Sequence, residues 1–197
     1  MTEDKTLLRR EMKARREALF QSQPFAGDKI AERFPMKLLD RFGPIVSGYL
    51  PIGSEVDARP LMQRLARNGA QLALPRVEAD NQMTFRSWAR GDALEAGRFS
   101  LTQPSVESLE LRPTLVLMPL LAFDPLGNRL GYGQGHYDRV LSLLRKSGHV
   151  FTCGIAFSDQ QVDFIPAEPH DVPLDWVVTE TGSLPLFLQR ASTPRKV

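Results

Sequence analysis

Short runs of apolar and β-branched residues alternate along this chain with longer segments in which apolar residues recur at helical spacing. The spacing predicts helices within 2–20, 28–41 and 58–67; Pro35 interrupts the second, and Asn68 and Gly69 end the third. The short apolar runs predict strands at 45–50, 71–75, 83–88, 114–119, 150–157 and 176–179.

This alternation favours an α/β fold. Helices that alternate with short buried strands pack on both faces of a mostly parallel sheet, which gives a three-layer α/β/α arrangement. The chain has no internal repeat or low-complexity tract, so we expect one domain over residues 1–197. Sites in such folds gather beyond the carboxyl ends of strands. The loops of interest therefore follow Leu50, Pro75, Met118 and Phe157.

Composition narrows the functional classes. Of the 197 residues 42% are hydrophobic, which is enough for one continuous core, and 25 Lys and Arg against 23 Asp and Glu leave a net charge of +2. This balance provides no extended basic face, so no nucleic-acid partner is expected. The first residues lack the apolar core of a signal peptide, and no apolar run is long enough to cross a membrane. We expect a cytoplasmic monomer with no membrane partner, in which the single cysteine, Cys153, is a buried small residue.

A glycine-rich segment, AFDPLGNRLGYGQGHYDRVL at 122–141, follows a predicted strand and runs into a helical pattern. Its glycines allow positive φ, and the helix that follows offers its N-terminus to an anion, so the segment suits phosphate binding. It is neither a Walker A loop nor a Rossmann fingerprint. On the glycines alone, a tight connection between strand and helix is an equal alternative.

The residues beside these glycines favour a nucleotide site. Arg129 supplies a planar cation suited to phosphate, and Asp138 supplies a hard oxygen ligand suited to Mg²⁺. His136 and Tyr137 could stack on a flat heterocycle, although an aromatic residue at a helix start is more often simply packed.

The first predicted helix carries a cluster of cations. At about 100° per residue, one sector of this helix collects Lys5, Arg9, Lys13 and Arg16. A solvated face paired with acidic neighbours is the favoured interpretation in the absence of other information. An RNA-binding helix is the alternative, but it lacks interleaved aromatic residues.

Taken together, these segments resemble the 5-formyltetrahydrofolate cyclo-ligase family over nearly the whole chain and in the same order. The glycine motif with Tyr-Asp-Arg after it is the most specific part. The matching segments are the pair Lys5 and Arg9, GYLPIGSEVD at 48–57, LALPRV at 72–77, the stretch 118–139 and the block 154–180.

The resemblance implies a scaffold similar to the NagB/RpiA/CoA-transferase-like fold, ATP as co-substrate, Mg²⁺ as cofactor and 5-formyltetrahydrofolate as substrate, with the polyglutamate preference left open. ATP would be held by Lys5, Arg9, Arg129, Leu130, Gly131, Tyr132, Gly133, Gln134, Gly135, His136 and Tyr137. The folate would contact Leu50, Glu55, Tyr132, Gly133, Gln134, Gly135 and His136. The expected catalytic residues are Arg129, Tyr137 and Asp138, and the expected metal ligands are Asp138 and Asp175.

Two departures from the family pattern concern the glycine segment. Tyr132 stands where the family commonly has Arg, and His136 where it commonly has Tyr. Loss of the guanidinium removes a bidentate donor, so Arg129 or the backbone must compensate, or turnover is slower. One alternative is therefore a folate-sequestering protein, and another is a sugar-phosphate isomerase-like enzyme on the same scaffold. His170 and Asp171 lack an accompanying nucleophile, which favours a structural pair.

Overall fold

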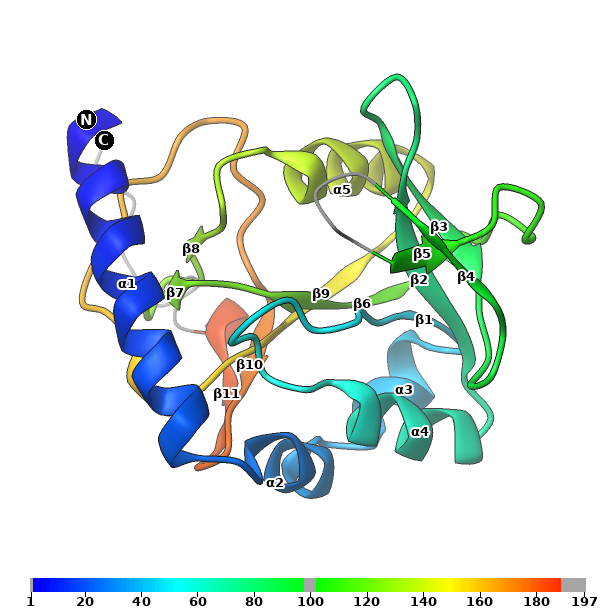
Figure 1. The fold of residues 1–197 in the computed structure, drawn as a ribbon, viewed down its shortest axis with the longest axis horizontal. Coiled ribbons are helices and arrows are strands. Elements are labelled where there is room, and N and C mark those ends of the chain that lie inside the picture. The colour runs from blue at the N-terminus through cyan, green and yellow to red at the C-terminus, as the bar shows by residue number, and fades with distance from the viewer. Residues whose placement is uncertain (1, 98–101, 189–197) are drawn as a thin grey trace.

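The computed structural model describes residues 2–97 and 102–188, and a seven-stranded sheet forms its centre (Figure 1). The strands lie across the sheet in the order β11 (Ser183–Pro185), β10 (Trp176–Val178), β9 (Phe151–Ile155), β6 (Leu115–Pro119), β1 (Ile45–Ser47), β2 (Gln71–Val77) and β3 (Met83–Ser87). Neighbours from β10 to β2 run parallel, whereas the edge strands β11 and β3 pair antiparallel. The predicted mostly parallel α/β sheet is confirmed.

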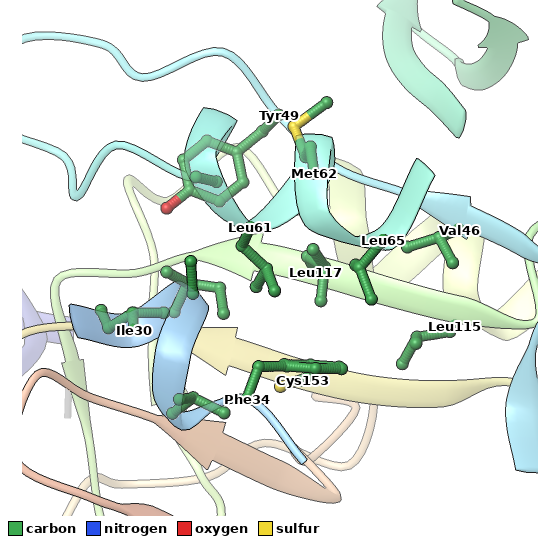
Figure 2. Packing of buried hydrophobic residues seen from close by; sticks show 14 of the residues in the cluster. Ile30, Phe34, Val46, Tyr49, Leu61, Met62, Leu65, Leu115, Leu117 and Cys153 are labelled. Carbon is green, nitrogen blue, oxygen red and sulfur yellow. The ribbon is translucent and has the colours of Figure 1, made fainter. Parts of the chain in front are cut away.

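Helices cover both faces of this sheet. On one face lie α2 (Ala26–Arg33), α3 (Lys37–Phe42) and α4 (Arg59–Arg67), and the other face is covered by α5 (His136–Ser147). Side chains alternate along β6, so that Leu115 and Leu117 pack with the first group and Val116 and Met118 pack with α5. Figure 2 shows the first core, in which Leu61 of α4 lies over these strands.

Helix α1 (Thr2–Ser22) stands at one end of the sheet beside the small hairpin of β7 (Ala122–Phe123) and β8 (Arg129–Leu130) (Figure 1). Met12 is buried there against Leu121 and Leu130. This placement brings the polar face of α1 to the glycine-rich segment. A second small sheet pairs β4 (Leu94–Ala96) with β5 (Thr102–Pro104), and a short 3₁₀ helix spans Ser158–Gln160.

Pro35 divides the predicted helix at 28–41 into α2 and α3. The preceding residue, Phe34, is extended with φ −61° and ψ 123°, as expected because a proline ring disfavours helical geometry at the residue before it. In the part of the chain that the structure describes, no helix is both long and apolar enough to span a membrane.

Candidate functional site

A cavity of about 550 Å³ opens where the strands of the main sheet end. Its walls include Tyr49 and Leu50 after β1, Pro75 in β2 and Pro119 at the end of β6. Further parts of the wall come from α1, the glycine-rich segment and the loop that contains residues 168–171, and from Met83 and Thr102. The cavity therefore lies at the carboxyl ends of parallel strands, which is where a doubly covered sheet places its ligands.

The glycine loop, residues 131–135, connects β8 to α5 and lines this cavity. Gly133 has φ 93° and Gly135 has φ 63°, a backbone region that favours glycine because it has no Cβ. Gly135 is also the N-cap of α5, and no side chain caps this end. The first N–H groups of α5 and its positive dipole end are thus presented beside the loop, as at an anion-binding site.

Two cations of α1 face the glycine loop and its neighbours. Arg9 Nε donates a hydrogen bond to the Gly131 carbonyl at 3.0 Å, and Lys5 Nζ lies 3.0 Å from Glu168 and 3.2 Å from Asp171. Burial lowers the pKa of Lys5, but the hydrogen bonds to Glu168 and Asp171 more than offset it, so the pKa is raised. Both cations line the cavity.

The interpretation of the cationic sector as a solvated face holds for one member and fails for another. Lys13 is exposed, whereas Arg16 is only 2% exposed. Sequence reasoning did not identify Arg16 as a site residue. Its position two turns after Arg9, on the same side of the helix, was the available signal.

Arg129 and Asp138 form an ion pair within the lining of the cavity. Arg129 Nη2 lies 2.6 Å from Asp138 Oδ1, and Arg129 also donates to the Val172 carbonyl. The same Asp138 oxygen accepts the Val172 N–H at 3.0 Å. The carboxylate at the start of α5 is therefore fixed by two donors.

Asp175 lies elsewhere. Its Oδ2 accepts hydrogen bonds from the N–H and the hydroxyl of Thr152, each at 2.9 Å, and lies 3.4 Å from Arg145 in the last turn of α5. Asp138 and Arg145 are seven residues apart, or about 10 Å along the helix. Asp175 does not line the cavity, so the structure does not bring the two predicted metal ligands together. Among the described residues there is no group of three side chains suited to a metal.

The other end of the cavity holds a buried carboxylate. Glu55 is 2% exposed, and its Oε2 accepts the Ile52 N–H at 2.9 Å. Its Oε1 lies 3.8 Å from Arg16 Nη1 and accepts no hydrogen bond within the described part of the chain. Burial raises the pKa of Glu55, opposed by the Ile52 N–H, by Arg16 and by the nearby Tyr132 hydroxyl. A buried carboxylate oxygen without a hydrogen bond of normal length can accept an N–H from a ligand.

Aromatic side chains line the wall between these two ends. Tyr137 is partly buried, and burial raises the pKa of its phenol. Burial and then Arg139 lower the pKa of His136, which keeps this imidazole neutral at neutral pH. His170 is exposed and lies nearest to Glu168, at 3.4 Å, with Asp171 at 3.9 Å.

Known proteins resemble this chain along most of its length. The family model described as 5-formyltetrahydrofolate cyclo-ligase matches residues 1–180. The 5-formyltetrahydrofolate cyclo-ligase of Mycolicibacterium smegmatis is 35% identical over 145 residues, which cover 70% of this chain and 74% of that protein. The protein of the same name from Escherichia coli is 32% identical over 142 residues, which cover 68% and 76%.

Solved structures agree with these sequence matches. The 5,10-methenyltetrahydrofolate synthetase of Aquifex aeolicus superposes with a TM-score of 0.73 at 26% identity, covering 98% of this chain and 95% of that one. The synthetase of Mycoplasma pneumoniae gives a TM-score of 0.67 at 27% identity, with 90% and 99% covered. The matched sequence includes α1, the glycine loop and the strands that bear the cavity. The chain therefore belongs to the 5-formyltetrahydrofolate cyclo-ligase family, a family of ligases.

Proposed function

We propose that this chain converts 5-formyltetrahydrofolate to 5,10-methenyltetrahydrofolate with consumption of ATP and release of ADP and phosphate. The observation that supports it most directly is that one cavity joins a glycine-lined end, which bears Lys5 and Arg9, to the buried carboxylate of Glu55, whose Oε1 faces Arg16 at 3.8 Å. A triphosphate fits the first end and the N–H-rich edge of a reduced pterin fits the second.

The cationic end would hold the triphosphate. Lys5 and Arg9 of α1 face the glycine loop, and the N-terminus of α5 lies at the other side of the same loop. These groups neutralise phosphate charge and align the γ-phosphate without forming a covalent bond to it, which is the main task of a protein in phosphoryl transfer. The hydrogen bonds of Lys5 to Glu168 and Asp171 raise its pKa and hold its ammonium group in place.

The carboxylate end would hold the pterin. Glu55 Oε1 accepts an N–H of the pterin's amidine-like edge, while the Ile52 N–H fixes Oε2. Leu50 and Tyr132 line the adjoining wall. The formyl oxygen then attacks the γ-phosphorus and ADP leaves. N10 attacks the activated carbon, phosphate departs with the oxygen, and the proton of N10 is released.

One of the two predicted magnesium ligands lies in the cavity. Mg²⁺ is commonly held by one or two carboxylates together with substrate phosphates, and Asp138 lies in the cavity at the start of α5, beside the glycine loop. We propose Asp138 as its protein ligand, with Asp175 in a structural role at the far end of α5. When bound, the ion would reduce the negative charge of the phosphates.

The test is formation of the methenyl product, followed by its absorbance, in the presence of ATP, Mg²⁺ and 5-formyltetrahydrofolate. Asp138→Asn and Arg129→Ala should each lower kcat/KM about tenfold or more, the scale of a lost contact worth more than about 1.4 kcal/mol. Asp175→Asn is the matched control because it changes the same group outside the cavity. It should leave the magnesium concentration for half-maximal rate unchanged.

Four outcomes would contradict this proposal. Wild-type rates in Asp138→Asn and Arg129→Ala would move the site elsewhere. A raised magnesium requirement in Asp175→Asn would restore the carboxylate pair that the sequence predicts. Tight folate binding without product, or full activity on a sugar phosphate without ATP, would favour the sequestering or isomerase alternatives.

A further inference from the structure

Arg16 is a buried cation that touches three separate segments of the chain. Its guanidinium donates to the Ser54 hydroxyl at 3.3 Å, to the Leu120 carbonyl at 3.4 Å and to the Tyr132 hydroxyl. These partners belong to the loop after β1, the connection after β6 and the glycine loop. One side chain of α1 thus joins three walls of the cavity.

The charge of Arg16 demands an ionised partner. A buried guanidinium is costly unless it is paired and hydrogen-bonded, and Glu55, which is equally buried at 2% exposure, lies 3.8 Å away. The ring of Tyr132 also lies beneath the guanidinium, with 5.4 Å between the Arg16 Cζ and the ring centroid. If Glu55 or Tyr132 moved away, the buried Arg16 guanidinium would lose its charged partner or one of its hydrogen-bond acceptors.

We propose that Arg16 is a positioning residue for the folate end of the cavity, because it fixes both the Glu55 carboxylate and the Tyr132 ring. This inference rests on the proposed function. Arg16 itself does not line the cavity, whereas both of its partners do. It therefore acts on the folate through Glu55 and Tyr132. It also links the glycine loop, assigned above to the nucleotide, with the carboxylate assigned to the pterin.

This role predicts that Arg16 sets the pH range over which folate binds, through the ionisation of Glu55. The titratable groups that face Glu55 are Arg16 from α1, Tyr49 after β1, Tyr132 of the glycine loop and Tyr137 of α5. Burial raises the pKa of Glu55 and Arg16 lowers it. Without Arg16 this pKa rises further, so the ionised carboxylate that accepts the pterin N–H is lost at a higher pH.

The experiment compares Arg16→Met, which removes the charge and keeps an apolar stem, with Arg10→Met, the same change at an exposed position of α1. Equilibrium binding of 5-formyltetrahydrofolate is measured without ATP from acid to neutral pH, together with KM for folate and for ATP. Arg16→Met should weaken folate binding about tenfold or more and shift its acid limb to higher pH. KM for ATP should change much less, and Arg10→Met should match the wild type.

Tyr132→Phe provides a second variant if Arg16→Met does not fold. Tyr132 is 47% exposed, so its hydroxyl can be removed without opening the core. Loss of this acceptor should weaken folate binding about tenfold or more, as for one hydrogen bond to a charged group, and should leave ATP binding intact. A wild type that binds folate without cyclising it would refute the proposed function alone. Unchanged folate affinity and pH profile in the folded variants would overturn the role of Arg16.

Discussion

Gly131 and Gly133 lie two positions apart in the same loop but differ in what their backbones allow. Gly133 has φ 93°, and a Cβ there would lie 3.4 Å from the guanidinium carbon of Arg9. Gly131 has ordinary φ, and a Cβ there would meet nothing within 4 Å. The two positions therefore form a matched pair for testing whether the shape of the loop matters.

Gly133→Ala should raise KM for ATP about tenfold, because a left-handed conformation costs an L-residue about 1–2 kcal/mol. The loop will therefore leave the conformation that it has in the structure. Gly131→Ala should stay close to the wild type, since its carbonyl can still accept the Arg9 hydrogen bond. Steady-state kinetics at varied ATP distinguish them. Equal KM values in both variants would show that this conformation of the glycine loop is not required.

Single residues also mark the limit of what the sequence could predict about the site. Lys5, Arg9, Glu55 and the glycine loop were expected at a ligand, and the structure gathers all of them around one cavity. The helical spacing placed Arg16 on the same side as Arg9 but did not predict its burial, which depends on partners from three distant loops. Asp175 lies just before β10 and outside the cavity, a position that a motif match does not reveal.

At the scale of elements, apolar runs located every long strand. The predicted runs at 71–75 and 114–119 correspond to β2 and β6 within one or two residues. The short strands β4, β5, β7, β8 and β11 escaped prediction because they lie outside the apolar runs that marked the equally short β1 and β10. Their pairing depends on tertiary contacts, as in the hairpin of β7 and β8 that leads into the glycine loop.

The contact between α2 and α4 is close enough to test by adding one carbon. A Cβ on Gly27 of α2 would lie 2.4 Å from the Asp57 carbonyl oxygen just before α4, and backbone cannot yield as a flexible side chain does. Gly27→Ala should therefore lower the free energy of unfolding by about 1–3 kcal/mol despite the better helix propensity of alanine.

Chemical denaturation in urea measures this loss as a lower midpoint. Gly148→Ala is the control, because that position after α5 is exposed and extended, and a Cβ there would meet nothing within 4 Å. Its free energy of unfolding should stay within about 0.5 kcal/mol of the wild-type value. A midpoint for Gly27→Ala equal to that of the control would mean that α2 shifts freely relative to α4.

For the whole molecule, one sheet shared by two apolar cores predicts a single cooperative unfolding transition. ATP with Mg²⁺ at about one hundred times its dissociation constant should add about 2.7 kcal/mol, which raises the melting temperature by roughly 5–10 °C for a chain of this size. AMP, which lacks the terminal phosphates, should raise it less. Differential scanning calorimetry tests both points, and two separate transitions would refute the single-domain prediction. The monomeric state stays a prediction.

The ion pairs of Lys5 join positions that lie 163 and 166 residues apart. During synthesis, α1 leaves the ribosome first, whereas Glu168 and Asp171 emerge only after every parallel strand except β10. The ion pairs of Lys5 can therefore form only after most of the chain has been synthesised. Nascent chains that stop short of these acids should therefore leave Lys5 without its two carboxylate partners.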